Sequence, residues 1–539
     1  MSQQLEFFHK SEFAPIPLGL DSIVMGYLKS HHYIDLVDSL LPPNSNDLGL
    51  SWGELCALAI TKLISAEKCY LTKLPHYAAS IPMAAWLERE DVDPTMFNRN
   101  AVGAMLDSIA EFGADRFYTA LASSLLYRTE LQNIEVANIA GSSVSYIIHG
   151  SSNAVEPNTS EKLAELEEYW GEDLAKIEIK LGGVRGKQAQ ESQGRLDYSY
   201  ALVRPSDAAF SLPIFQQLLS ENDHDLSASG SGSAQNTEQS LAQMKYILPH
   251  LRYLVADYAT DTASTASLCK QKGLELITRL PNSLAVVKRV FTAMAEAEVE
   301  KGKVSWQIFE PKADADADAA TGSDETILLS EMGSYALTNR TDKSLAPVEG
   351  KMIVVRAESK EQEFVLWCSD LNLDPQQAYR YYQQQAGAKS VWGSAKAPQC
   401  FVDSLYINSA QRQRALCSLL SVALLVQQLI LQSFHDYLHS SGQAVPRASH
   451  NKPTQTPAWG TLCDGISNTR IVFNFASSKV EAAIVDGFAI GFLLQAKPEI
   501  QKMYSAEFLS SYSQAIQNGF SKFAEKQGQL ASGVAFTLG

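Results

Sequence analysis

The chain has 539 residues and a mass of 59.0 kDa, more than a single hydrophobic core usually supports, so several structural regions are expected. Apolar residues make up 45% and charged residues 19%, which is typical of a folded globular protein and excludes disorder along the whole chain. The formal net charge of −16 means that the chain repels a phosphate backbone unless its cations gather on one face.

Cysteine use and hydropathy indicate a cytoplasmic protein without membrane contact. The seven cysteines form no Cys-x-x-Cys pair and no spacing suited to zinc, so we expect reduced core thiols. The first residues, MSQQLEFFHKSEF, contain no basic segment followed by an apolar one, so no signal peptide is expected. The most apolar run, residues 415–426, is too short to span a bilayer and predicts a buried helix.

The N-terminal quarter of the chain has a helical pattern. Apolar residues recur at three- and four-residue spacing in SWGELCALAITKLIS and again in residues 101–128. Ser51 and Glu54 have the spacing of a capping box at the start of the first of these helices. These patterns predict a helical region over residues 1–131.

A β-rich pattern follows. Residues 133–150 are rich in β-branched side chains and predict a strand, a turn and a second strand. A charged helix is expected at residues 160–180, a strand at 196–205, and a flexible polar loop at 227–240. Residues 251–281 predict strand, helix and strand, which implies a parallel pair with a right-handed crossover. Asp257 directly follows the first of these strands, at the end where ligands usually bind.

In the second half of the chain, predicted strands are again followed by predicted helices. Three strands are expected in KVSWQIFE, GSYALTN and KMIVVRAES, with an acidic surface loop at residues 313–325 between the first two. Residues 374–441 predict helices, and residues 480–495 predict the beginning of a helical C-terminus. The expected regions are residues 1–131 (helical), 132–281 (first part of the core), 282–373 (β-rich insertion), 374–441 (helical second part of the core) and 442–539 (helical C-terminus).

Four stretches carry a resemblance when they are taken together and in order: residues 97–122, 253–283, 381–429 and 450–466. They include a strand ending in Ala-Asp, a later Ile-Thr-Arg strand, a Tyr-x-x-Gln segment, and an Asn-Lys-Pro-Thr segment. The chain resembles the DDE transposases of bacterial insertion sequences, in the subgroup with a β-rich insertion before the last catalytic acid. The resemblance implies an α/β fold with an RNase-H-like mixed-sheet core, flanked by helical regions.

The resemblance also implies a catalytic triad of carboxylates. Such enzymes use two Mg²⁺ ions, about 4 Å apart, to activate the attacking oxygen and stabilise the leaving one. Because Mg²⁺ prefers oxygen ligands, a neutral or cationic side chain does not replace a carboxylate. The first acid is expected on a central strand, the second at the end of another strand, and the third on a helix.

One position of the triad matches and two do not. Asp257 stands where the family has its second acid, although an aspartate there also commonly caps a turn or helix. The first acid aligns with Ala140, or with Ser142 in a second register, and residues 136–155 contain no Asp or Glu. Glu135 reaches the position only through a shift of five or seven residues.

The third acid position is occupied by a lysine. Counting back from Lys396 and Pro398 places Lys389 at the family's glutamate, and residues 375–402 contain no Asp or Glu. An ammonium pointing into the site would pair with Asp257 in place of a metal ion. One carboxylate cannot hold two Mg²⁺ ions, so we expect no bound metal and no phosphoryl transfer.

We therefore expect a non-catalytic, transposase-like protein that binds double-stranded DNA or regulates an insertion element. It is expected to form a homodimer or a higher homo-oligomer. Two alternatives stay open: a scaffold without DNA binding, and an active transposase that uses displaced acids such as Asp261 or Glu156. The candidate phosphate contacts are Lys389, Lys396, Arg412, Arg414 and Lys452, together with the cations of residues 288–290.

Overall fold

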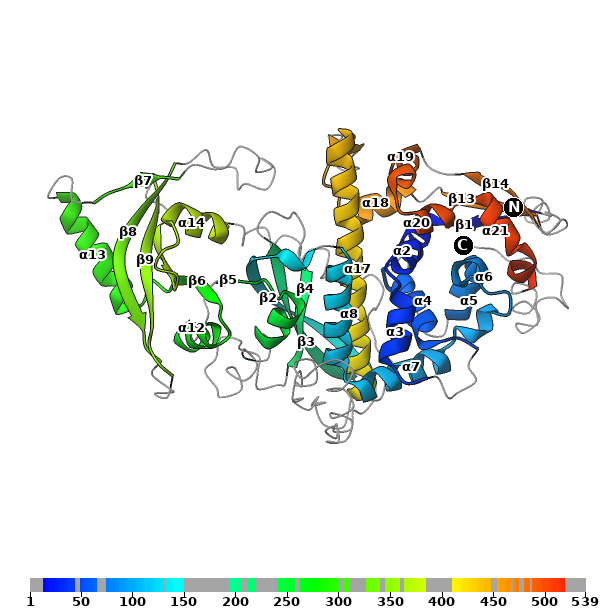
Figure 1. Ribbon diagram of the computed structural model, residues 1–539, viewed down its shortest axis with the longest axis horizontal. Coiled ribbons are helices and arrows are strands. Elements are labelled where there is room, and N and C mark those ends of the chain that lie inside the picture. The colour runs from blue at the N-terminus through cyan, green and yellow to red at the C-terminus, as the bar shows by residue number, and fades with distance from the viewer. Residues whose placement is uncertain are drawn as a thin grey trace.

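The structure is a computed structural model, and its helices and strands are described over most of the chain (Figure 1). The described residues are 13–43, 49–64, 74–129, 131–149, 193–205, 212–219, 238, 241–256, 262–299, 304–309, 326–339, 345–358, 363–383, 410–446, 453–466, 469–474, 479–484 and 487–518. The predicted helix at residues 160–180 and the predicted loops at 227–240 and 313–325 lie wholly or mainly outside them.

The N-terminal region is helical, as predicted. Its α-helices are α2 (Gly19–Ser30), α3 (Tyr33–Leu40), α4 (Trp52–Ile64), α5 (Leu74–Ser80), α6 (Met83–Leu87), α7 (Arg99–Phe112) and α8 (Ala114–Arg128). The capping box is confirmed in both directions. The N–H of Glu54 donates to Ser51 Oγ at 3.1 Å, and the N–H of Ser51 donates to Glu54 Oε2 at 2.8 Å. This start fits α4, whose residues are all buried.

A nine-stranded mixed sheet forms the other half of the molecule, which confirms the α/β class. Its order is β4-β3-β2-β5-β6-β10-β9-β8-β7. The strands are β2 (Val136–His149), β3 (Gln193–Pro205), β4 (Leu212–Leu219), β5 (Tyr253–Ala256), β6 (Glu275–Leu280), β7 (Gln307–Ile308), β8 (Ile327–Leu337), β9 (Val348–Ala357) and β10 (Glu363–Cys368). Strands β2, β5 and β6 run parallel, and the other neighbours are antiparallel.

Strand β2 differs from the prediction, because it is one strand of 14 residues and has no turn. Its register with β3 runs without interruption from the pair Ala137–Pro205 to the pair His149–Gln193. A partner strand from residues 193–205 satisfies the backbone N–H and C=O groups of the extended chain along nearly the whole of β2. That partner lies too far along the sequence for a local pattern to reveal it.

The strands of residues 282–373, the region predicted as a β-rich insertion, join the same sheet. Strand β10 pairs antiparallel with β6, and β9, β8 and β7 extend the sheet outward from it. The segment KVSWQIFE contributes only the two residues of β7, while α13 (Ala285–Val299), which was not predicted, precedes it. Strands β7 to β10 therefore widen the sheet beyond β6, as the left half of Figure 1 shows.

The strand–helix–strand prediction for residues 251–281 is confirmed by β5, α12 (Thr262–Gln271) and β6, with β5 and β6 parallel. Side chains of β5 alternate between two cores. Leu254 packs in the cluster that includes Cys269 of α12, whereas Tyr253 and Val255 pack with Tyr381 of α14 (Pro375–Gln383). Helices α12 and α14 thus cover opposite faces of the sheet.

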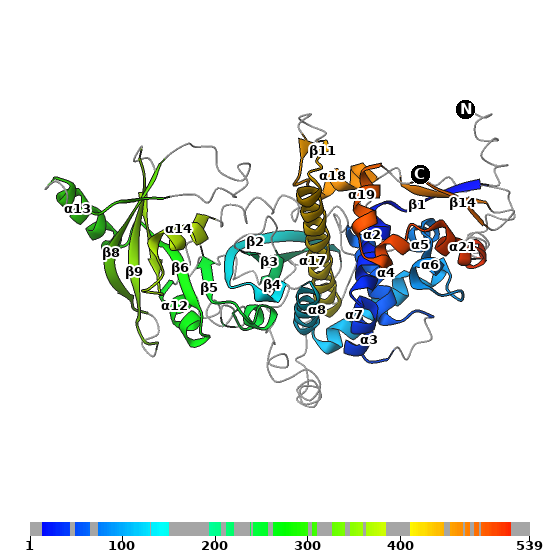
Figure 2. The same ribbon diagram turned by 45° about the horizontal axis from the view of Figure 1, so that its top comes forward.

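Helix α17 (Ala410–Ser441) stands between the sheet and helices α2 to α4, whereas α8 lies beside it on the side of the sheet (Figures 1 and 2). It packs on α4, α7, α8 and the edge strand β4. Residues 414–441 are long and apolar enough to cross a membrane by composition, but 89% of the most apolar window is buried inside the protein. The prediction of a buried helix for residues 415–426 is confirmed, and Gln427 and Gln428 after it are buried too.

The C-terminal region is helical only in part, so the prediction of a helix from residue 480 is wrong at its start. Residues Lys479–Ile484 form β14, which pairs with β13 (Arg470–Asn474), and β13 pairs with β1 (Phe13–Pro17) at the other end of the chain. The remaining elements are β11 (Val445–Pro446), β12 (Pro453–Thr454), α18 (Trp459–Ile466), α19 (Gly487–Gln495), α20 (Pro498–Lys502) and α21 (Ala506–Ser511).

Candidate functional site

The parallel register between β2 and β5 leads to two of the expected acid positions. It begins at Val136 opposite Tyr253 and ends at Ile139 opposite Ala256. The next residues in the chain are Ala140 and Asp257. The backbone at Ala140 and Ser142 continues in β2, opposite Leu202 and Tyr200 of β3 respectively. Asp257 lies outside the described residues, as do the displaced candidates Asp261 and Glu156.

Helix α14, which precedes the expected third acid position, is held on β5 and β10 by aromatic contacts. The ring of Tyr381 lies 5.5 Å from that of Tyr253 on β5. The ring of Tyr382 lies 5.5 Å from that of Phe364 on β10. Helix α14, which ends at Gln383, therefore lies on the face of the sheet that contains Tyr253 and Val255. Lys389 and Lys396 themselves lie outside the described residues.

A buried polar cluster, which the sequence reasoning missed, lies at the beginning of β5 and β6. Asp370, which follows β10 and is only 8% exposed, accepts a hydrogen bond from Tyr253 Oη at 2.7 Å and one from Arg252 at 3.2 Å. It also accepts from the N–H of Asn372 at 2.9 Å. This last bond is an Asx-turn, so the Asp-x-Asn spacing after a strand was the available signal.

The charge of Asp370 is stabilised by these donors. Burial alone would raise its pKa, but the hydrogen bonds from Tyr253 and the Asn372 N–H, with the positive charge of Arg252, lower the pKa below its usual value. Burial, followed by the hydrogen bond to Asp370, raises the pKa of Tyr253 far above its usual value. Both groups keep a single protonation state near neutral pH, so this cluster fits a structural role.

The cluster connects the segment after β10 to the first residues of the parallel strands β5 and β6. Ser369 Oγ donates to Glu275 Oε2 at 2.5 Å and accepts from the N–H of Leu276 at 2.8 Å. Glu275 and Tyr253 both begin their strands, whereas the expected acid positions follow the other end, at Ala256. The fold is therefore anchored at the end of β5 opposite the candidate site.

Two of the candidate phosphate contacts are engaged in ion pairs. Arg412 donates from Nε and from a terminal nitrogen to the two carboxylate oxygens of Asp107 on α7, both at 2.5 Å. Arg414 pairs with Asp115 on α8, and their side chains are 17% and 7% exposed. These arginines fasten α17 to the N-terminal helices. Arg414 is the more enclosed of the two, and both stay predicted phosphate contacts.

The cations of residues 288–290 differ from these arginines. Lys288 and Arg289 are exposed on α13, whose other face buries Val287 and Met294. Neither cation forms an ion pair with a described carboxylate. They remain accessible candidates for phosphate contact. Lys452 lies outside the described residues.

The described cysteines are free thiols, and most of them are core residues. Burial raises the pKa of Cys269, Cys368 and Cys417 to about 12, so these thiols are neutral and poorly reactive. Within the described part of the chain, no group of three or more His, Cys, Asp or Glu side chains is placed to hold a metal ion.

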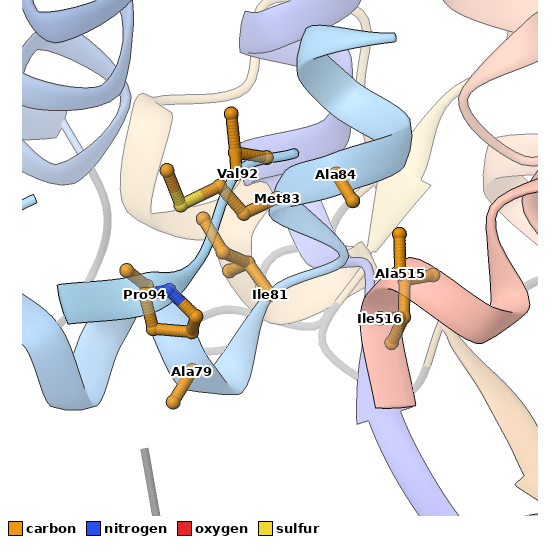
Figure 3. Close-up of a pocket in the computed structure, with 9 residues that line it drawn as sticks. Ala79, Ile81, Met83, Ala84, Val92, Pro94, Ala515 and Ile516 are labelled. Carbon is orange, nitrogen blue, oxygen red and sulfur yellow. The ribbon is translucent and has the colours of Figure 1, made fainter. Parts of the chain in front are cut away.

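Two cavities in the described structure lie among the helices. The first, of about 10 Å³, lies where Met83 and Ile81 approach Ala515 and Ile516, and it has room for at most one water molecule (Figure 3). The second, of about 390 Å³, lies between α2, α17 and the α19–α20 corner. Neither is lined by residues of β2 or β5.

Comparison with known protein families gives a match to the N-terminal helices. Residues 18–123 match a family described as a domain of unknown function, DUF4277. This match spans α2 to α7 and most of α8. A search of curated proteins found no match to the chain. The match marks the N-terminal helices as a conserved type of unit and attaches no activity to them.

Proposed function

We propose that the chain is a cytoplasmic, transposase-like protein that has lost phosphoryl transfer and acts as a non-catalytic DNA-binding or regulatory protein. The observation that carries the proposal is the register of β2 and β5, which ends at Ile139 and Ala256. These residues directly precede Ala140 and Asp257, so the expected first and second acid positions follow neighbouring points of adjacent strands. One of the two positions has no carboxylate.

The arrangement of the sheet supports an RNase-H-like core. Strand β2 lies between β3 and β5 in the interior of the sheet, as expected for the strand of a first acid. Strand β5 is its parallel neighbour, as expected for the strand that ends in a second acid. The third position follows α14, a helix that packs on those strands.

The residues at the three positions do not fit the two Mg²⁺ ions that the resemblance implies. Mg²⁺ is held by carboxylate and other oxygen ligands. Ala140 offers a methyl group, Ser142 in the alternative register offers a neutral hydroxyl, and Lys389 offers an ammonium. Asp257 alone would remain as an anionic ligand, and two-metal catalysis requires shared carboxylates.

The test is a nicking and strand-transfer assay on supercoiled DNA with Mg²⁺ or Mn²⁺. We expect no product from the wild type and none from Asp257→Ala. Activity that disappears in Asp257→Ala would refute the loss of function. Activity that disappears in Asp261→Ala or Glu156→Ala would establish the alternative with displaced acids. The double variant Ala140→Asp with Lys389→Glu tests simple decay, which predicts that metal-dependent nicking returns.

A scaffold without DNA binding is the second candidate, and the ion pairs of Arg412 and Arg414 favour it. These pairs explain the cationic start of α17 without a nucleic acid. A mobility-shift assay with duplex DNA at low salt separates the two candidates. A complex that weakens steeply with salt supports DNA binding, whereas no shift at any salt concentration supports the scaffold. Light scattering after size exclusion tests the proposed homodimer or higher oligomer.

A further inference from the structure

The cavity of about 390 Å³ beside α17, called here the α17 pocket, has the size of a small-ligand site (~300–1,000 Å³). Three separate parts of the chain form it: α2, the C-terminal half of α17, and the corner between α19 and α20. These elements lie together in both ribbon views (Figures 1 and 2). The pocket is distant in sequence from the strands that carry the proposed function.

The floor of the α17 pocket is apolar. Ile23 and Tyr27 of α2, Ile430 of α17 and Phe492 of α19 line it, and each is at most 6% exposed. The ring of Phe492 is stacked on Phe434 with centroids 3.7 Å apart, which fixes the position of that wall. A rigid apolar floor open to solvent favours a ligand with a hydrocarbon or aromatic part, because burying that part removes apolar surface from water.

The rim of the pocket carries a positioned cation. Lys497, exposed at the corner before α20, donates from Nζ to Nε2 of His31 at 3.1 Å. Nδ1 of His31 lies 2.9 Å from the carbonyl oxygen of Tyr27, so a proton on Nδ1 leaves Nε2 as the acceptor for the lysine. Among the described residues, no carboxylate forms an ion pair with Lys497. Its charge is therefore held at the pocket and left uncompensated.

The rim also carries one anion, Asp436, on the α17 side. Its carboxylate accepts a hydrogen bond from the amide of Gln432, its neighbour one turn earlier, at 2.6 Å. Asp436 is exposed on its helix, where water screens its charge. The better positioned charge is that of Lys497, which is tied to a buried histidine. Charge complementarity therefore favours an anionic head group.

We propose that the α17 pocket binds a free, single-chain amphiphilic carboxylate, whose apolar part covers Ile23, Ile430 and Phe492 and whose carboxylate pairs with Lys497. The pocket joins α2, within the DUF4277 match, to the C-terminal helices. An occupant would therefore tie the two ends of the helical half together and stabilise the folded state by mass action.

Isothermal titration calorimetry on the full-length protein at pH 7.5, with decanoate below its micelle concentration, tests the proposal. We expect saturable binding with one decanoate per chain and weaker binding of the uncharged decanol. Lys497→Met should weaken decanoate binding about tenfold, the range of a lost charge-assisted hydrogen bond. Lys270→Met, the same change on exposed Lys270 of α12, is the matched control and should bind as the wild type.

Two further variants distinguish the site from general adsorption. Ser433→Trp, at an exposed lining position of α17, should block the pocket and abolish binding while the melting temperature stays close to that of the wild type. Asp436→Asn should strengthen decanoate binding, because it removes a repulsive charge. Three results would overturn the proposal: no saturable binding, wild-type affinity in Lys497→Met, or tighter binding of decyltrimethylammonium than of decanoate.

Discussion

The guanidinium of Arg414 and the carboxylate of Asp115 form an enclosed ion pair that joins α17 to α8. A second pair, Arg412 with Asp107, lies half a turn away on α17 and is far more exposed, at 42% and 47%. Both pairs join an arginine of α17 to an aspartate of the N-terminal helices, Asp115 on α8 and Asp107 on α7, and they differ in burial. This difference allows a matched test of how α17 is held.

Asp115→Asn removes the carboxylate that pairs with the enclosed charge of Arg414. We expect a loss of about 3–5 kcal/mol in the free energy of unfolding, the range measured when one member of a buried pair is removed. Asp107→Asn, the control, should cost at most ~1 kcal/mol, because water screens the exposed pair. Urea denaturation of the three proteins measures both values. Equal losses in the two variants would contradict this account.

His31 should make the stability of the helical half depend on pH. Burial lowers the pKa of His31 to about 4; its hydrogen bond to the backbone of Tyr27 opposes this shift, and the charges of Lys497, Arg128 and His32 add to it. Between pH ~6.5 and ~4 the unfolded chain binds a proton that the folded chain does not, so stability falls as the pH is lowered, by about 3 kcal/mol in total.

The comparison of wild type with His31→Gln isolates this contribution. Urea denaturation at pH 7.5 and at pH 4.5 should give a smaller difference between the two pH values for His31→Gln than for the wild type. Other titrating groups contribute equally to both proteins. The same pH dependence in both would show that His31 accepts a proton in the folded state as readily as in the unfolded one.

If the chain binds DNA, exposed cations of α13 should contribute to it. Reversing both charges with Lys288→Glu and Arg289→Glu should weaken duplex binding and reduce the slope of log K against log salt by about 2, one for each lost phosphate contact. Arg99→Glu, at another exposed cation on α7, is the control and should leave the slope unchanged. Fluorescence anisotropy at several salt concentrations measures the slope for each protein. An unchanged slope in the double variant would remove α13 from the interface.

Gly53 permits the close approach of α3 and α4, within the DUF4277 match. A Cβ at Gly53 would overlap the carbonyl oxygen of Ile34, and the N–H of Gly53 donates to Asp38 Oδ1 at 2.7 Å. We expect Gly53→Ala to cost about 1–3 kcal/mol through overpacking. Gly460→Ala is the control, since a Cβ there meets no heavy atom of the described residues within 4 Å. A helical alanine at 460 should be neutral or stabilising by up to ~1 kcal/mol.

Local interactions account for the correct sequence predictions. The start of α4 depends on Ser51 and Glu54, three residues apart, and the β5–α12–β6 unit follows from apolar periods within 30 residues. The absence of Asp and Glu from residues 136–155 and 375–402 is likewise a property of the sequence alone. These features are encoded in neighbouring residues, so no distant partner changes them.

The wrong secondary-structure predictions lie where pairing with a distant segment determines the conformation. The expected turn within residues 133–150 is extended because β3 pairs along its whole length, and the expected helix from residue 480 begins as a strand because β13 pairs with it. The ion pair of Arg414 with Asp115 and the contact of His31 with Lys497 likewise join residues that lie hundreds of positions apart in the sequence.

The sequence by itself determined the periodic elements and the missing carboxylates, because spacing and residue chemistry are local. Only the tertiary structure decided that Ile139 lies beside Ala256, that β7 to β10 extend the same sheet, and that Arg414 is enclosed while Lys288 is exposed. The physical reason is that strand pairing, burial and electrostatic screening depend on which remote segments meet, and the period of a single segment does not specify its partner.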